Sequence, residues 1–511
     1  MSRNVYLAEI VAATNSAGTL TTLRYSSDHF TSAISDSPPN TYYAPRIKQP
    51  ALMRRDVFDA GRTFGASRVG YGELVLANPD GDLDALIDYG FDGQACTLRL
   101  GLTTATYPGS FTTLLVGTVE QPEFSNNEVT FRMRDKQMKF DRPFQTTLYS
   151  GNNALPNGLE GVSDDLKGKP KSKVYGAVFN VSPPCVNTSR LIYETGVCNS
   201  IVAVYDRGAA LTVGSNYVSQ ADMEAVAPPA SNFRSWVAGG YFRLGSSPAG
   251  LITTDIQQGA NAAARTVGQI MNTVALNVVS ASDISSVDVT SLDNADSSVV
   301  GIWVAEERTH ASVMDELCGT PGAWWGFDRL GVLRMKQLLA PSGTSVASFS
   351  NTELFSINRI SAASDPGKGL PIWKIKLNYY KNYTVQNNDL AGSVTDVRRQ
   401  FLANEFRTVT AVDSNIINQH LLAPSYLLDT LYTVEANAQT EATRRLNMYK
   451  VRRDLLEIRV HVDETTMAAV DLGSVVTVTT SRFGYSSGKQ FAVLGIEPNY
   501  AANILNLSLW G

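Results

Sequence analysis

The side chains that could do acid–base or nucleophilic chemistry are few and lie far apart in the sequence. The chain has four histidines, His29, His310, His420 and His461. A serine or cysteine nucleophile needs a base within hydrogen-bond reach, usually a histidine. None of the four lies in a motif such as Gly-x-Ser-x-Gly, so each is interpreted as a partly buried or surface residue. We predict no catalytic residue.

Nucleotide-binding motifs are also missing from the sequence. No P-loop occurs, and no Gly-x-Gly-x-x-Gly opens a strand–helix unit. Two carboxylates placed for glycoside hydrolysis stay open as a possibility, because their separation is spatial and the sequence singles out no pair.

The acidic run Asp80-Gly81-Asp82-Leu83-Asp84 is the string most similar to a metal-binding loop. Calcium loops place carboxylates at alternate positions, with glycine at position six and a bidentate glutamate at position twelve. Here those positions hold Ala85 and Phe91. A turn that places Asp near the start of a helix explains the run better, because carboxylates stabilise that end of a helix. We predict no metal and no cofactor.

The four cysteines, Cys96, Cys185, Cys198 and Cys318, are widely spaced and include no Cys-x-x-Cys pair. A zinc ribbon is therefore not supported. Cys318 follows Val313 and Leu317 at helical spacing, which is typical of a small core residue. Cys185 and Cys198 are the one plausible disulfide pair, and free thiols are the preferred interpretation.

Basic residues gather around one amphipathic helix near the end of the chain: Arg444, Arg445, Lys450, Arg452 and Arg453. A solvated helix face is the preferred interpretation. The alternative is a contact to a neighbouring subunit or to DNA in transit.

The composition suggests a folded protein that is covered by partners. A length of 511 residues suggests three or four domains, and 43% hydrophobic residues suffice for packed cores. Only 18% of residues are charged, and the net charge is −5, which excludes a general nucleic-acid binder. The opening Met1–Leu7 has no signal-peptide pattern, and no run of apolar residues is long enough for a membrane span. We expect the chain to be made in the cytoplasm.

Alternating apolar and polar residues predict a mainly β chain with a few flanking helices. The predicted strands are 4–12, 19–25, 72–78, 95–102, 111–119, 128–134, 173–181, 201–206, 241–245, 302–305, 373–380, 455–462, 475–480, 489–496 and 504–510, with a hairpin over 323–335. The predicted helices lie near Leu83–Ile87, over 259–278, at Thr309–Cys318, and along the stripe Val434, Ala438, Ala442, Leu446 and Tyr449, in which Glu441 and Arg445 pair. Residues 280–298 are expected to be a connector with one short strand.

Four units follow from these elements. They are a tube-like β domain (1–150), an inserted β-rich peripheral domain (151–299), a second β domain with one helix (300–395), and a C-terminal helix with a small closed or half-closed barrel (396–511). Several β-barrel or sandwich domains are therefore expected, two of them similar to a tail tube.

Four groups of short strings occur in order along the chain, beginning with Gly72-Glu73-Leu74-Val75-Leu76-Ala77-Asn78-Pro79-Asp80-Gly81-Asp82. The groups are 72–86 with 89–93, 111–119 and 131–135; then 169–170, 174–176, 204–208 and 242–244 leading to Gly250; then 323–331; and last 430–432, 441–442, Arg444 and 471–478. In this order they resemble the hub proteins of bacteriophage tails, the ring that closes the tail tube and carries the tip.

The resemblance implies a homotrimer in which two tube-like units per chain form a pseudo-hexameric ring that continues the tail tube. It implies a structural, non-enzymatic virion protein of the tail tip, with DNA only in transit and no stable membrane insertion. The implied partners are distal tail or tube proteins, tip or fibre proteins, and a tape-measure protein. Some relatives hold an iron–sulfur cluster on clustered cysteines, and the wide cysteine spacing here does not match such a cluster.

Two other functions remain open from the sequence. A tail-associated cell-wall hydrolase would need an acid–base pair in a cleft. A receptor- or glycan-binding protein would use exposed aromatic residues such as Trp236, Trp324 and Trp325. For the adjacent pair, strand alternation predicts instead one tryptophan in the core and one at a subunit contact.

Overall fold

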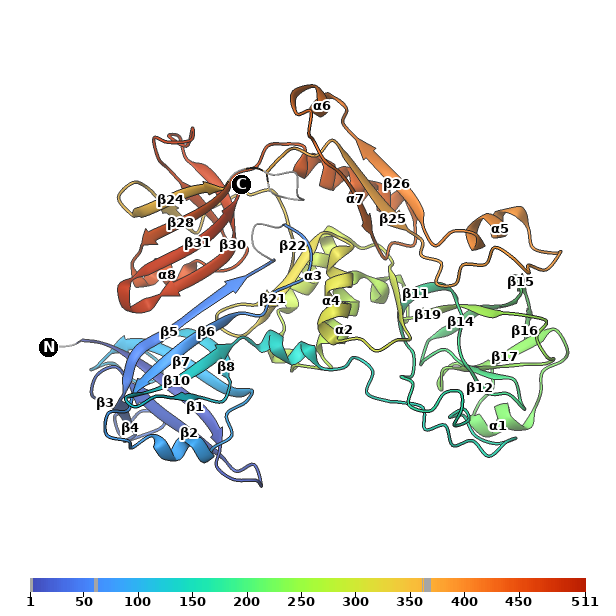
Figure 1. Ribbon diagram of the computed structural model, residues 1–511, viewed down its shortest axis with the longest axis horizontal. Helices are drawn as coiled ribbons and strands as arrows, with labels where there is room; N and C mark the ends of the chain where they lie inside the picture. Colours follow the sequence, from blue (N-terminus) through green and yellow to red (C-terminus); the bar gives the residue numbers. More distant parts are fainter. Residues whose placement is uncertain (1–2, 59–62, 361, 363–368) are drawn as a thin grey trace.

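The structure is a computed structural model that describes residues 3–58, 63–360, 362 and 369–511, so Met1 and Ser2 of the opening segment lie outside it. Strands account for 38% of the chain and helices for 18%, distributed over several sheets. The prediction of a mainly β, multi-domain chain is confirmed (Figure 1). The division at residues 150, 299 and 395 stays a prediction.

The N-terminal strand β1 buries apolar side chains on both of its faces, Val5 and Leu7 in one cluster and Ala8, Ile10 and Ala12 in another. Strands β4 and β5 are separated by the single residue Arg46. The elements are β1 (Asn4–Ala13), β2 (Leu20–Ser26), β3 (Phe30–Thr31), β4 (Tyr42–Pro45), β5 (Ile47–Asp56), β6 (Tyr71–Ala77), the 3-10 helix η1 (Asp84–Asp88), β7 (Gln94–Leu102), β8 (Thr112–Val119), β9 (Glu123–Phe124), β10 (Glu128–Arg134) and η2 (Lys136–Asp141).

Two five-stranded sheets form a peripheral lobe at the right of Figure 1. Their orders are β15-β14-β19-β11-β20 and β12-β13-β18-β17-β16. The elements are β11 (Lys173–Val181), β12 (Cys185–Asn187), β13 (Ile192–Glu194), β14 (Ser200–Asp206), β15 (Ala209–Ala210), β16 (Thr212–Val213), α1 (Gln220–Ala225), β17 (Asn232–Trp236), β18 (Tyr241–Leu244), β19 (Ile252–Gln258) and β20 (Gly301–Val304).

The centre of the molecule is a layer of helices packed on a β-hairpin. Contacts join α2 to α3 and α4, α3 to β22, and α4 to β21. The elements are η3 (Ala262–Arg265), α2 (Val267–Ala275), η4 (Ala281–Asp283), α3 (Ser286–Ala295), α4 (His310–Gly319), β21 (Ala323–Phe327) and β22 (Leu333–Gln337).

The remaining strands form two groups. The three-stranded sheet β26-β25-β27 is covered by α7, and the others join the N-terminal sheet. The elements are β23 (Ala347–Phe349), β24 (Leu354–Ile360), β25 (Lys374–Tyr379), α5 (Asp396–Leu402), β26 (Arg407–Val412), α6 (Asn415–Gln419), β27 (Ser425–Asp429), α7 (Glu435–Tyr449), β28 (Leu455–His461), α8 (Glu464–Ala469), β29 (Val475–Val478), β30 (Lys489–Asn499), η5 (Tyr500–Ala502) and β31 (Ile504–Trp510).

Strand β5 pairs with β30 through Gly495–Asp56 and Ile496–Arg55, so the first and last parts of the chain share one 16-stranded sheet. Its main path runs from β24 to β3 and has two ends. The C-terminal strands are predicted to form a closed or half-closed barrel. No closed barrel occurs among the described strands, so the closed form of this prediction is wrong.

Three local predictions are wrong or incomplete. Residues 280–298 contain no strand; they form η4 and then α3, whose start is capped by the Ser285 hydroxyl accepting from the Asp288 N–H. The Ser and Asp residues that suggested a connector are helix-capping residues. The helix expected over 259–278 is two pieces, η3 and α2, and Ala262 and Ala263 are exposed.

The alternation expected for Trp324 and Trp325 is also wrong, because both are buried, at 4% and 1% exposure. All five residues of β21 are buried. Trp325 donates its Nε1–H to Asp315 of α4 at 2.7 Å, and its ring lies 4.9 Å from that of Phe140. Trp324 lies against Gly473, where a Cβ would approach its ring to 2.6 Å. Covered on both faces, β21 leaves neither tryptophan free for a glycan or a subunit contact.

The long helix α7 confirms most of its predicted apolar stripe, since Ala438, Ala442, Leu446 and Tyr449 are buried. Val434 instead precedes the helix and is 48% exposed. Glu441 and Arg445 pair as predicted, at 2.6 Å between Oε1 and Nε, yet both side chains are only 5% exposed.

The solvated-face interpretation of the basic cluster is therefore wrong for its first two residues. Arg445 donates to the carbonyls of Gly319 and Thr320 at 2.6 and 2.8 Å. Arg444 donates to the carbonyls of Pro321 and Leu338 and pairs with Glu441. The exposed carbonyls at the end of α4 need donors, and these arginines supply them. They fix α7 to the central layer.

We predict that Glu441→Ala lowers the free energy of unfolding by about 3–5 kcal/mol, because it leaves a buried arginine without its carboxylate. Chemical denaturation followed by tryptophan fluorescence measures the change. Thr443→Ala, at an exposed position of the same helix, is the control and should change stability by less than about 0.5 kcal/mol. Equal effects of the two substitutions would contradict the role assigned to Glu441.

Candidate functional site

Seven neighbouring strands, in the order β10-β6-β5-β30-β31-β28-β24, present one polar face. Side chains alternate between the two faces of a strand. The inward face carries buried apolar side chains, among them Phe131, Leu74, Ile496, Leu507 and Ile458. The opposite side chains face outward, and we call this surface the polar sheet face.

The strand register aligns polar side chains in a row across both ends of the chain. The pairs Arg134–Tyr71, Tyr71–Arg54, Glu497–Asn506, Asn506–Arg459 and Arg459–Ser356 are direct neighbours on adjacent strands. The step from Arg54 to Glu497 follows from the β5–β30 pairing. The row therefore crosses from the N-terminal strands to the C-terminal strands without interruption.

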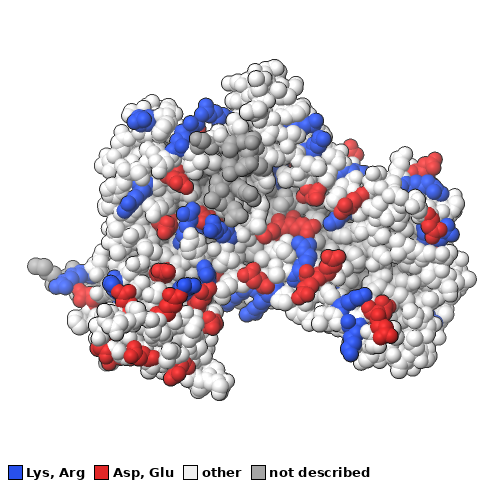
Figure 2. Space-filling view, in the orientation of Figure 1, with Lys and Arg blue, Asp and Glu red and all other residues white. Residues whose placement is uncertain are grey.

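Two hollows on this face meet at the junction and share Arg54 and Glu497. One, of about 280 Å³, lies over β24, β28, β31 and β30, and the other, of about 370 Å³, lies over β5, β6 and β10. Charges of both signs line them, and Arg134 pairs with Glu120 at 2.7 Å. Figure 2 shows the same interspersed pattern on its face of the molecule, with no large patch of one sign. A surface of this polarity is better suited to contact with water and with mobile charged molecules than to a permanent apolar interface.

A buried ion pair holds the two halves of this sheet together. Arg55 of β5, 3% exposed, donates to Asp471 Oδ1 at 2.6 Å. Asp471 Oδ2 accepts from the backbone N–H of Arg329 at 3.0 Å. Arg329 lies in the turn between β21 and β22, and its side chain donates to the carbonyls of Ala468 and Thr113. One hairpin turn thus ties N-terminal and C-terminal strands to the central layer.

Asp135 lies beside this junction and is 4% exposed. Its carboxylate accepts from the backbone N–H groups of Gly70 and Gln137 at 2.8 and 3.0 Å. Burial raises the pKa of Asp135 to about 7, although those two N–H groups and the charge of Arg55 act in the opposite direction. A Cβ at Gly70 would approach the Asp135 carboxylate to 2.7 Å, so this close packing requires glycine.

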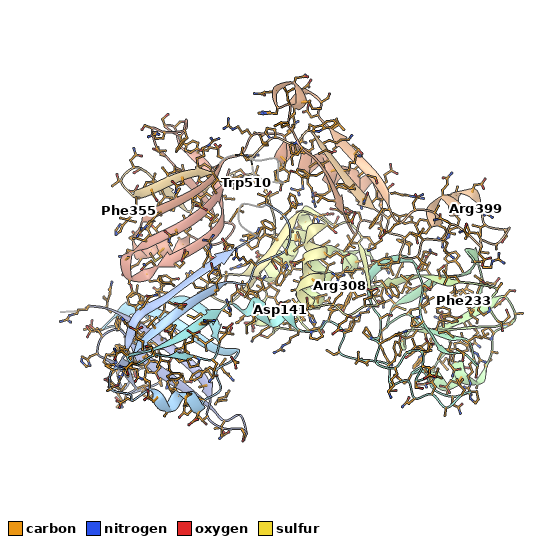
Figure 3. All side chains as sticks on the ribbon, viewed as in Figure 1. Asp141, Phe233, Arg308, Phe355, Arg399 and Trp510 are labelled. Carbon is orange, nitrogen blue, oxygen red and sulfur yellow. The ribbon has the colours of Figure 1, made fainter. Side chains whose placement is uncertain are left out.

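Strand β24 ends the sheet, with β28 as its one partner among the described strands. Its Phe355 is 62% exposed, and the Arg459 guanidinium lies 5.9 Å from the ring centre. Figure 3 shows Phe355 at the outer margin of the C-terminal strands, whereas Trp510 lies on the inner side. The outer edge of β24 has backbone N–H and C=O groups without a partner among the described strands, and the exposed Phe355 lies on the same strand.

The histidines occupy four separate places, as expected for residues without a common chemical role. His29 and His461 are exposed and His420 is partly buried. His310, 5% exposed, contacts the Arg142 carbonyl through Nδ1 at 3.1 Å, and burial lowers its pKa. Within the described part of the chain, no hydrogen bond joins any of the four to a serine or cysteine side chain.

The acidic run forms the expected turn. Arg46 binds Asp80 with two hydrogen bonds of 2.6 and 2.7 Å and Asp82 with one of 3.0 Å. Asp84 lies in the first turn of η1. The arginine occupies the oxygens that a cation would need, and no group of three or more His, Cys, Asp or Glu in the described part of the chain could hold a metal ion.

All four cysteines are free thiols, as predicted, with Cys96, Cys198 and Cys318 buried and Cys185 partly buried. Burial raises the pKa of Cys96 to about 12, which keeps it protonated and unreactive. Among the described helices, none is long and apolar enough to cross a membrane.

Carboxyl groups of raised pKa, the usual sign of an acid catalyst, occur at four separate positions. Burial raises the pKa of Asp135, Glu194, Asp255 and Asp315. Each accepts hydrogen bonds from protein groups of its own: Asp255 from Tyr205 and Asn180, and Asp315 from Trp325 and Ser67. No two of the four share a hydrogen-bond partner, so they do not form an acid–base pair. Each one stabilises the loop or strand whose groups donate to it.

No pattern in the sequence indicates the Arg55–Asp471 pair or the polar row. Alternation along β10 does place Arg132 and Arg134 on one face. Strand β30, which pairs with β5, however, begins more than 350 residues after the end of β10, and only the fold brings their polar side chains into one row.

A scan against models of protein families finds no match, and a search of curated proteins finds none. Solved structures that are similar to this chain include the 43 kDa tail protein of prophage MuSo2 from Shewanella oneidensis. Its sequence identity is 12% and its TM-score 0.40, over 99% of this chain and 98% of that chain. A tail protein from Neisseria meningitidis MC58 has 9% identity and a TM-score of 0.44 over 99% and 96%. A chain of a gene transfer agent virion has 14% identity and a TM-score of 0.39 over 68% and 85%.

We predict that Arg55→Met lowers the free energy of unfolding by about 3 kcal/mol, since it removes one partner of a buried pair. Chemical denaturation measures this change in the free energy of unfolding. Lys48→Met is the control: Lys48 is 60% exposed and pairs with Glu128 at the surface, where a pair contributes at most about 1 kcal/mol. A loss for Arg55→Met no larger than that for the control would contradict the junction.

Asp135 should make stability depend on pH near neutrality. Its folded pKa, about 7, lies above the usual 3.8, so the folded state holds the proton more tightly. Its contribution is full below about pH 4 and is lost as the pH rises through 7. We expect the stability of Asp135→Asn relative to the unsubstituted chain to rise between pH 5 and pH 8, measured by denaturation at each pH. A difference that is constant across this range would refute the assignment.

Proposed function

We propose that the chain is a structural subunit of a phage tail: the hub of the tail tip, in which three copies form a ring and the polar sheet face lines a lumen. The observation that carries this proposal is the continuous polar row across the N-terminal and C-terminal strands. Two β units that share one sheet within each chain give six units in a trimer.

The geometry supports a ring over a solitary molecule for two reasons. The seven-stranded part of the sheet is apolar on its inner side and hydrophilic on its outer side, the polar sheet face. This is expected of a sheet that separates a core from water. Strand β24 leaves an edge whose backbone groups another subunit can pair with. A head-to-tail contact closes into a ring when the rotations of successive copies add up to one full turn, and the proposed trimer meets this condition.

The proposed partners are those of a tail tip. Distal tail or tube proteins stack on the ring, tip or fibre proteins bind its outside, and the tape-measure protein and then DNA occupy the lumen. Mixed charges on the polar sheet face suit transit, because a surface of both signs holds DNA weakly. The protein then belongs to the virion, at the tail tip.

The proposed role is mechanical and not catalytic. The raised-pKa carboxyls are spread over four places and are held by structural hydrogen bonds. A cell-wall hydrolase would need two carboxyls of different pKa across one cleft. Turbidity assays on purified peptidoglycan test this part, and clearing that is lost on one carboxylate substitution would contradict it.

We predict that the full chain forms particles of threefold symmetry, alone or with co-expressed tail proteins. Light scattering coupled to size exclusion gives the mass, and negative-stain images give the symmetry. Phe355→Asp, which places a charge at the exposed edge of β24, should reduce ring formation while leaving the monomer folded. Val213→Asp, on an exposed strand of the peripheral lobe, is the control.

A monomer that stays monomeric beside its tail proteins would overturn the proposal. So would a ring that Phe355→Asp and Val213→Asp affect equally, since the edge of β24 would then have no part in assembly.

A further inference from the structure

The peripheral lobe contains a pocket of about 400 Å³ that the ring does not require. It lies where the start of β11, the turn after β13, the turn before β18, the end of β19 and the segment that follows η2 come together. Its volume falls within the roughly 300–1,000 Å³ typical of small-molecule sites. Figure 1 places these strands in the lobe farthest from the N- and C-terminal sheet.

One residue of the lining, Glu194, carries a buried carboxyl group. Glu194, 4% exposed, accepts from the Tyr149 hydroxyl and from the Gly196 N–H at 3.2 Å. Burial raises the pKa of Glu194, and these hydrogen bonds oppose that rise. The turns beside it are packed tightly: a Cβ at Gly196 would approach the Ser172 carbonyl oxygen to 2.6 Å, and Gly196 has a φ of +80°. The wall is rigid and preformed.

Two amide side chains of the lining have unused hydrogen-bonding capacity. Gln145 is 4% exposed; its nitrogen donates to the Val304 carbonyl at 3.1 Å, and its oxygen has no partner among the described residues. The amide oxygen of Gln258, another residue of the lining, is also buried without a partner among the described residues. Unsatisfied buried acceptors cost folding free energy, and a ligand that donates to them would recover it.

Donors and aromatic rings complete the lining. Lys171 pairs with Glu160 at 2.5 Å, and Lys173 donates to the Phe144 carbonyl at 2.6 Å, which leaves N–H groups on each ammonium. Tyr175 and Tyr241 also line the pocket. The ring of Tyr241 stacks on that of Trp236 at 5.8 Å and 15°, which fixes its orientation.

We infer that this pocket binds a neutral sugar, one pyranose residue of a larger glycan. A pyranose carries hydroxyl groups that both donate and accept, which match the free acceptors of Gln145 and Gln258 and the lysine N–H groups. Its C–H face packs on tyrosine rings. An anion would be attracted by Lys171 and Lys173, but it could not donate to the two unpaired amide oxygens, so it fits less well. A purely apolar ligand would leave the polar groups unpaired.

The experiment uses the full chain and defined neutral sugars. A glycan array finds the preferred sugar, and titration of that monosaccharide, followed by ligand-observed NMR, gives its dissociation constant. Glucose, galactose and N-acetylglucosamine are the first probes, with inorganic phosphate as the anionic one. Val197, 62% exposed, lies in the pocket lining, so Val197→Trp fills the opening at little cost to folding.

The matched control is Val213→Trp, which is equally exposed at 62% and lies outside the lining. We expect Val197→Trp to abolish sugar binding and Val213→Trp to leave it unchanged. Gln258→Met, which keeps the shape and removes the amide, should weaken binding about tenfold. Thermal unfolding of each variant confirms that it is folded.

Three outcomes would overturn the inference: no neutral sugar binds, phosphate binds in preference to every sugar, or Val197→Trp binds as well as the unsubstituted chain. These outcomes test sugar binding independently of ring formation. A trimer that binds no sugar would contradict this inference and leave the proposed ring unaffected.

Discussion

A buried arginine that must meet a carboxylate is the constraint on which the rest of the structure depends. Arg55 lies in β5, 3% exposed, and its partner Asp471 comes from a loop over 400 residues later. A lone buried charge is too costly to tolerate, so the fold places the C-terminal strands against the N-terminal ones. That placement brings β30 beside β5 and joins the N-terminal and C-terminal strands into one sheet. The hairpin turn at Arg329 then connects the sheet to the central helices.

A polar wall follows from this placement. Because the side-chain period along a strand is two, the same register that buries Ile496 and Leu507 points Glu497 and Asn506 outward. The outward side chains of seven strands therefore form one surface with both signs of charge. The sheet ends in β24, whose Phe355 is exposed, and the peripheral lobe projects away from it (Figure 1). Low charge content and an unpaired edge agree with a subunit that other subunits complete.

Local patterns predicted most of the strands, since alternation and turn residues are local signals. The strand at 128–134, the hairpin at 323–335 and the helix that begins after Thr309 lie where the sequence placed them. Long-range consequences were not predictable. Arg444 and Arg445 look like a solvated basic face until the end of α4 supplies carbonyls for them. Strand alternation leaves one of Trp324 and Trp325 exposed, whereas the packing around β21 buries both. The Ser and Asp residues of 280–298 resemble a loop because capping residues and turn residues are the same types.

In the proposed assembly, a neighbouring copy completes this sheet at β24, and the polar side of the sheet faces water. Hydrogen exchange of the backbone amides of β24, compared between the isolated chain and the assembled particle, tests it most directly. We expect the β24 amides that do not bond to β28 to exchange quickly in the isolated chain and to be strongly protected after assembly. Equal exchange in the two states would contradict the account, because the edge would then pair with nothing.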